Sequence, residues 1–136
     1  MALQERYGLP DAADSSAAMV LNGGVAYSGG ICGAISGAAM AVGRLAEERI
    51  SDHREAKSVA RRLIHVLMAD FETEFEGRNC SQLIDFEISI PSQHDAFIES
   101  GVWRDTCMRQ IEFSVARLWT LTDPDAWDEA VRVLDT

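Results

Sequence analysis

A long uncharged stretch broken by glycines constrains the fold of this chain more than any other feature. No Asp, Glu, Lys or Arg occurs between Asp14 and Arg44, and Asn22-Gly23-Gly24 and Ser28-Gly29-Gly30 divide the stretch into pieces. Each piece is too short to cross a bilayer as a continuous apolar helix, because a span needs about 20 apolar residues. We therefore expect buried segments of a globular protein and no membrane among its partners.

The second piece carries small residues at helical spacing. Gly33, Gly37 and Ala41 recur every four residues, so they form a strip along one face of a helix expected over residues 31–45. A strip of small residues lets another backbone approach closely. We expect this helix at the centre of the fold, with Gly33 and Gly37 in backbone contact with another helix. On this view Gly37→Leu would overpack the contact at a cost of about 1 to 3 kcal/mol.

The rest of the chain shows helical periodicity and no alternating strand pattern of useful length. Further helices are expected at residues 1–7 (the end of a helix), 10–21, 52–77, 92–100 and 105–119, after Asp123-Pro124, and as a short turn at 79–83. The sequence therefore predicts an all-α protein, a compact helical bundle of about five or six helices around the central Gly/Ala-rich helix. Residues 1–136 are expected to form a single domain.

The charge balance excludes one large class of partners. The formal net charge is -10 and the isoelectric point is about 4.6. Binding to nucleic acid needs Lys and Arg side chains that displace counterions from phosphates, and an anionic membrane surface is disfavoured for the same reason. We expect no nucleic acid among the partners.

The cysteines indicate a reducing compartment. Cys32, Cys80 and Cys107 are an odd number with wide spacing and no CxxC motif, and residues 1–6 do not resemble a secretory leader. This pattern is not that of a disulfide scaffold. We expect a cytoplasmic protein with free thiols.

Each cysteine is also predicted in the first turn of a helix. The helix N-terminus favours the thiolate, which is the form that reacts or binds metal. Because the helix dipole contributes only about 0.3 to 1 kcal/mol at an exposed site, strong activation needs a second cause. A nearby cation is one candidate, and the arginines that could supply it are Arg78, Arg104 and Arg109.

Three segments together resemble a known family. They are Gly29-Gly30-Ile31-Cys32-Gly33-Ala34 with Gly37-Ala38, Asn79-Cys80-Ser81-Gln82-Leu83, and Cys107 ahead of an apolar helix. Over residues 7–121 the chain resembles the family named for its C-GCAxxG-C-C pattern, which is described as redox-active. The family's first cysteine lies on a helix upstream of the glycines, and here no cysteine precedes Cys32. We expect that this cysteine has been lost or truncated away.

Three functions remain open at this stage, and the sequence does not decide whether the chain is an enzyme. In the first, Cys32 works with Cys80 and Cys107 in thiol–disulfide exchange or electron transfer, for which two converging thiols suffice. In the second, the same three thiolates bind a metal or an iron–sulfur cluster, which lacks a fourth ligand within the chain. In the third, the chain is a structural or interaction domain with a decayed redox site. We favour exchange, with Cys32 as the nucleophile.

The glycine-rich loop is expected to serve that site. It lacks the Lys-Ser/Thr ending of a phosphate loop, and no strand precedes it. We expect Gly29, Gly30 and Gly33 to bind a cofactor or to let a partner atom reach the Cys32 sulfur. At least two of the three sulfurs should converge there. The expected partners are a redox protein and, through the small-residue helix, a second copy of the chain.

Overall fold

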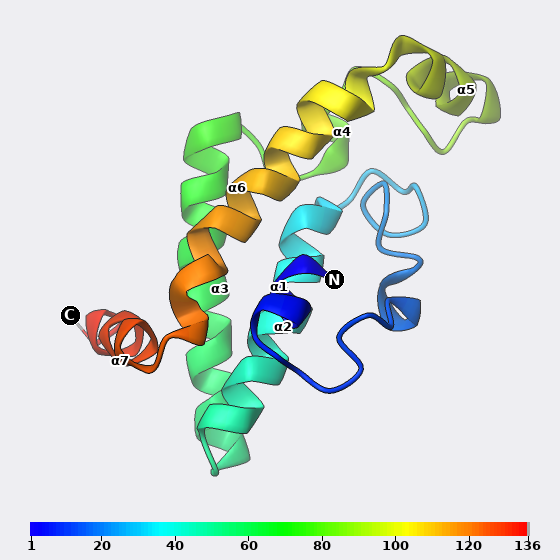
Figure 1. Cartoon of the computed structure of the whole chain (residues 1–136). Coiled ribbons are helices and arrows are strands. Elements are labelled where there is room, and N and C mark those ends of the chain that lie inside the picture. The colour runs from blue at the N-terminus through cyan, green and yellow to red at the C-terminus, as the bar shows by residue number, and fades with distance from the viewer. Residues whose placement is uncertain (136) are drawn as a thin grey trace.

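Seven α-helices make up the computed structural model, which describes residues 1–135 (Figure 1). They are α1 (Ala2–Arg6), α2 (Gly33–Arg49), α3 (His53–Phe75), α4 (Cys80–Leu83), α5 (Pro91–Ser100), α6 (Met108–Leu118) and α7 (Pro124–Val133). Two 3-10 turns (Ser16–Ala18 and Trp119–Thr122) and a π-helical turn (Trp103–Cys107) complete the helical structure. Within residues 1–135 there is no β-strand, only an isolated bridge between Ile31 and Asn79. The all-α prediction is confirmed.

The core lies between α2 and α3, the pair of helices with the most extensive contact. Buried residues Val42 and Leu45 of α2 pack with Val59 and Leu63 of α3. Asp52 begins α3 as predicted, because its carboxylate accepts a hydrogen bond from the N–H of Arg54 at 3.0 Å. α6 lies across both helices, and α7 lies at the end of the molecule opposite α5 (Figure 1). The prediction of a central, largely buried helix at α2 is therefore confirmed.

A smaller apolar cluster forms around α5. Ile84, Ile88 and Phe97 are buried together there, with Cys107 packed against them from the π-helical turn. Gly101 ends α5 in the left-handed conformation (φ 72°), as the sequence predicts. This cluster closes one side of the region in which the cysteines lie.

The helix predicted over residues 10–21 does not form. This segment consists of turns and the short Ser16–Ala18 turn, and none of its side chains is buried; Met19 is 69% exposed and Val20 54%. A short helix is stable in a protein chiefly through an apolar face packed on the core. Because the segment has no such face against α2, its local preference for a helix is not supported by packing.

The predicted packing of the small-residue strip is also wrong. A Cβ atom added at Gly37 would meet nothing within 4 Å, because this part of α2 borders a cavity. At Gly33 an added Cβ would lie 3.2 Å from the carbonyl oxygen of Leu21, in the preceding loop. The strip therefore faces a cavity and a loop and not a neighbouring helix, and the overpacking expected for Gly37→Leu does not follow.

Gly37→Ala should instead stabilise the protein. Alanine is better than glycine inside a helix by about 1 kcal/mol, and the added methyl group meets no neighbour. Gly43→Ala, at another open position of α2, should behave in the same way, whereas Gly33→Ala should gain less because of the Leu21 carbonyl. Urea denaturation checks this order, and a destabilised Gly37→Ala protein would contradict the open cavity.

Among residues 1–135, no helix combines the length and the apolar character that crossing a membrane requires.

Candidate thiol site

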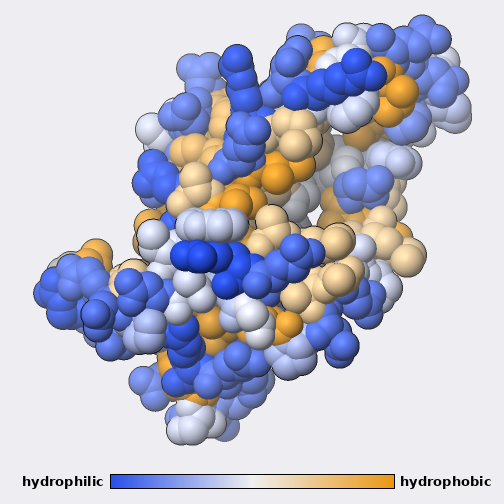
Figure 2. Space-filling view, in the orientation of Figure 1, coloured by the Kyte–Doolittle hydropathy of each residue, from blue (hydrophilic) through white to orange (hydrophobic). Residues whose placement is uncertain are grey.

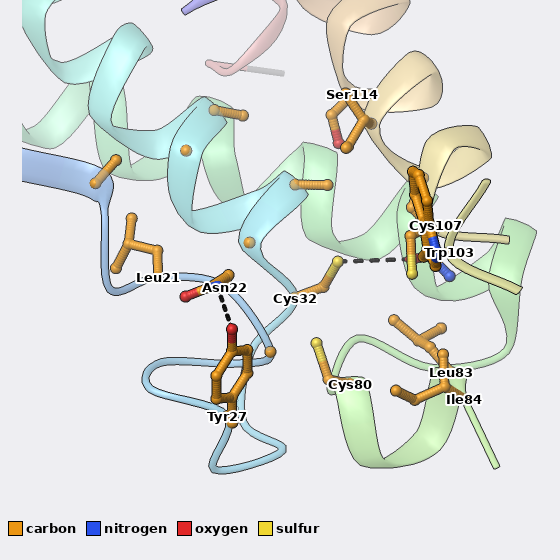
Figure 3. A pocket seen from close by; sticks show the side chains of 18 of the residues that line it. Leu21, Asn22, Tyr27, Cys32, Cys80, Leu83, Ile84, Trp103, Cys107 and Ser114 are labelled. Atoms are coloured by element: carbon orange, nitrogen blue, oxygen red, sulfur yellow. Dashed lines mark hydrogen bonds between the residues drawn. The ribbon is translucent and has the colours of Figure 1, made fainter. Parts of the chain in front are cut away.

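Backbone pairing brings Cys32 and Cys80 together. The N–H of Cys32 donates to the carbonyl of Arg78 at 2.9 Å, and the N–H of Cys80 donates to the carbonyl of Gly30 at 2.8 Å. These bonds flank the bridge between Ile31 and Asn79. The start of α2 is thereby fixed to the start of α4, and the two thiols lie within hydrogen-bonding reach of each other (Figure 3). The prediction that at least two sulfurs converge by the glycine-rich loop is confirmed.

The loop glycines leave the space that this backbone pairing needs. The carbonyl of Gly29 accepts a hydrogen bond from the N–H of Ser81 at 3.1 Å, next to the bond between Gly30 and Cys80. The N–H of Gly30 in turn donates to the carbonyl of Gly24 at 3.1 Å, where the two backbones touch. The carbonyls of Gly30 and Gly29 thus hold the N–H groups of Cys80 and Ser81, and Gly33 lies against the loop at Leu21. A cofactor role for these glycines stays a prediction.

Cys32 is the one thiol of the three whose pKa is lowered. It occupies the N-cap position of α2 and is only 6% exposed. The Cys80 thiol, as hydrogen-bond donor, lowers the pKa of Cys32 to about 7, and the N–H groups of Ala34 and Ile35 lower it further, while burial acts in the opposite direction. The thiolate of Cys32 is therefore favoured relative to that of an ordinary thiol.

Cys80 keeps its proton. The pKa of Cys80 is raised, first because its proton is held in the hydrogen bond to Cys32, and then by burial and by the negative charge on Cys32. Cys80 begins α4 as predicted, yet its own N–H and that of Ser81 are bonded to the glycine loop. A helix start alone therefore does not activate a cysteine here.

Cys107 differs from the prediction. Asp105 does not cap a helix, because the π-helical turn from Trp103 runs directly into α6 and Cys107 lies at the junction. Burial raises the pKa of Cys107, and the negative charge of Cys32 adds to this effect. All three thiols are free, and all three border the same cavity (Figure 3).

The cation expected to activate Cys32 is not what lowers its pKa. The causes are the Cys80 thiol and backbone N–H groups. Arg78 forms an ion pair with Glu72, and the Arg104 guanidinium stacks at 5.0 Å on the ring of Trp103. Arg109 is exposed. Activation by a neighbouring thiol was not predictable from the sequence, because residues 32 and 80 are paired only in the folded chain.

The cavity between α2, α6 and the loop has a volume of about 550 Å³. Figure 2 shows apolar side chains gathered on the face between α6 and the α1–α2 region, where the surface is hollowed. Two buried polar residues of α6 also line it, Gln110 (3% exposed) and Ser114 (2% exposed). The Cys32 thiol donates to Oε1 of Gln110 at 3.7 Å. The carboxamide can serve either state of the sulfur, because it carries an acceptor for the thiol and a donor for the thiolate.

Comparison with known proteins identifies the family. The model of the family described as "Putative redox-active protein (C_GCAxxG_C_C)" matches residues 1–119. The chain belongs to this family. No curated protein and no solved structure matches the chain. The resemblance found in the sequence is thereby confirmed over most of the chain.

In this C_GCAxxG_C_C protein, Gln110 and Ser114 were missed by sequence reasoning, although a signal was present. Cys107, Gln110 and Ser114 are spaced by three and four residues, so they share one face of a helix. That face would otherwise be expected to be apolar. Two polar residues in line with a cysteine were the available sign of a site on α6.

The C_GCAxxG_C_C pattern begins with a cysteine for which this chain offers no counterpart, since Cys32 is its first. α1, expected from the sequence as the end of the helix that carries it, contributes Ala2 and Leu3 to the cavity wall. Within residues 1–135, no group of three or more His, Cys, Asp or Glu side chains is arranged to hold a metal ion. The ligand set of Cys32, Cys80 and Cys107 therefore stays a prediction.

Proposed function

We propose that this protein carries out thiol–disulfide exchange, with Cys32 as the nucleophile and Cys80 as the resolving thiol. One observation carries the proposal: the Cys32 and Cys80 thiols lie side by side at the cavity, and their interaction lowers the pKa of Cys32 and raises that of Cys80. Exchange needs this division, because the thiolate attacks and a second thiol completes the reaction. Membership of a redox-active family supports the same chemistry.

The reaction has two steps. The Cys32 thiolate attacks one sulfur of a substrate disulfide, forms a mixed disulfide and releases the first substrate thiolate, which takes a proton from solvent. Cys80 then loses its proton and attacks the Cys32 sulfur, which forms a Cys32–Cys80 disulfide and releases the second substrate thiol. Two electrons pass from the protein to the substrate. A dithiol reductant must return them, which is the role we assign to the redox partner protein in a reducing cytoplasm.

Cys107 is not needed for these two steps. Its pKa is raised by burial, and it borders the cavity beside the pair. We assign it to the wall against which a substrate rests. The Cys107→Ser variant should therefore keep both steps.

The activation of Cys32 predicts a specific pH profile. The rate of alkylation by iodoacetamide should rise with pH through a midpoint of about 7, because only the thiolate reacts. In Cys80→Ala the midpoint should move upward to about 8.5 or above, since the hydrogen-bond donor is lost and burial then disfavours the thiolate. Peptide mass spectrometry after brief alkylation measures each cysteine separately.

Cys80→Ser is the matched control for this experiment. Its hydroxyl keeps a hydrogen-bond donor next to Cys32, so the midpoint should stay close to that of the unchanged protein. Equal midpoints in Cys80→Ala and Cys80→Ser would contradict activation by the hydrogen bond. A midpoint near the ordinary thiol value in the unchanged protein would instead favour the decayed redox site.

A further inference from the structure

The cavity at the thiols is lined mainly by uncharged side chains. Asp, Glu, Lys and Arg make up 25% of the chain, yet none of them is among the residues that line this cavity. Its floor is formed by the small residues Gly37, Ala38 and Ala41 of α2, and its rim includes Ile98 and Trp103. An anion would lose its hydration in such a site and would lie near the Cys32 thiolate. The cavity therefore selects against anionic ligands.

One polar group in this wall has no partner. Ser114 is 2% exposed, and its Oγ is the buried side-chain oxygen or nitrogen without a hydrogen bond among the described residues. Figure 3 shows the Ser114 side chain on the side of α6 that faces α2, above the thiols. A buried hydroxyl without a partner costs about 1 to 3 kcal/mol. A ligand oxygen at this point would remove that cost.

We infer that the cavity binds a neutral, mainly apolar small molecule whose single hydroxyl or carbonyl oxygen accepts a hydrogen bond from Ser114. Its volume of about 550 Å³ lies in the range of small-molecule sites. Such a molecule would be held against Cys32 and Cys80, which line the same cavity. The role of this molecule as substrate of the redox site rests on the proposed exchange function, whereas its binding to the cavity does not.

A single bound water suits the Ser114 position poorly. A bound water usually needs about three polar partners, and the polar side chain closest along α6, Gln110, lies one helical turn away and already accepts from Cys32. The small residues of α2 also keep the space open where larger apolar side chains would fill it. Both features favour an organic ligand with one oxygen.

Three probes of the same shape test the inference by equilibrium dialysis near neutral pH. Naphthol is neutral and carries one oxygen, naphthalene lacks the oxygen, and naphthoate carries a negative charge. We expect naphthol to bind about 5- to 10-fold more tightly than naphthalene, the value of one hydrogen bond. Naphthoate should bind more weakly than both. Bound naphthol should also slow the alkylation of Cys32.

Variants locate the binding. In Ser114→Ala the preference for naphthol over naphthalene should disappear while naphthalene still binds. Gly37→Leu should fill the cavity and abolish binding of both, and Gly43→Leu is its control, because Gly43 lies on the same helix but not in the cavity wall. If Gly37→Leu does not fold, the comparison of naphthol with naphthalene in Ser114→Ala still tests the ligand site.

The outcomes separate the two proposals. Binding of naphthol to Cys32→Ser, which cannot exchange disulfides, would support the ligand site even if the exchange function fails. Absence of naphthol binding, equal affinity for all three probes, or an unchanged naphthol preference in Ser114→Ala would each overturn the ligand site. None of these three results would bear on the alkylation profile of Cys32.

Discussion

Cys32→Ser should lose the exchange reaction at its first step, and Cys80→Ser should stop half-way. With dipyridyl disulfide, a neutral aromatic reagent, the unchanged protein should release two thiopyridone molecules for each Cys32–Cys80 disulfide that it forms. Cys32→Ser should react at least about tenfold more slowly near neutral pH, because the thiol with the lowered pKa is gone and burial still raises the pKa of the two remaining thiols. Absorbance of the released thiopyridone measures both the rate and the amount.

The trapped intermediate makes this test specific. Cys80→Ser should release one thiopyridone quickly and retain the other as a mixed disulfide on Cys32, which mass spectrometry detects. Cys107→Ser is the control, since it changes a cavity thiol outside the reacting pair and should release both molecules. If Cys107→Ser is trapped and Cys80→Ser is not, the assignment of Cys80 as the resolving thiol is wrong.

Gly24→Ala should have the largest effect on stability. Gly24 has a φ of 75°, and an added Cβ would overlap the backbone nitrogen and oxygen of Gly30. Strain at a positive φ and overpacking against a fixed backbone together should cost about 2 to 4 kcal/mol. Because Gly30 holds the N–H of Cys80, the change should also separate Cys80 from Cys32. The alkylation midpoint of Cys32 should then rise together with the loss of stability.

Gly8→Ala separates the backbone strain at a positive φ from the overpacking against Gly30. Gly8 has a φ of 66°, but nothing lies within 4 Å of an added Cβ. This variant should therefore show only the strain of the backbone, about 1 kcal/mol, and an unchanged alkylation profile. Urea denaturation compares the two proteins. Equal stability of Gly24→Ala and Gly8→Ala would contradict the close contact of Gly24 with Gly30.

Most helices could be predicted because their ends depend on nearby residues. The cap at Asp52, the Asp123-Pro124 start of α7 and the glycine after α5 all appear where the sequence places them. Asp123 accepts a hydrogen bond from the N–H of Asp125 at 3.0 Å, a contact over two residues. Such contacts are readable from the order of the amino acids alone.

Predictions that required a distant partner were less secure. The segment 10–21 was expected as a helix, but none of its side chains is buried in the core. The strip at Gly33 and Gly37 was expected against another helix, and it borders a loop and a cavity. Periodicity shows which residues share one face of a helix. It does not show what lies opposite that face.

The sequence by itself determined the all-α class and the family, because local spacing and a glycine–cysteine motif carry that information. Only the tertiary structure decided that Cys80 is the partner of Cys32, that Cys107 lacks a helix start, and that Gln110 and Ser114 join the site. The physical reason is distance along the chain. A thiol's pKa is set by the dipoles and hydrogen bonds within a few ångströms, and here a donor 48 residues away supplies the largest effect.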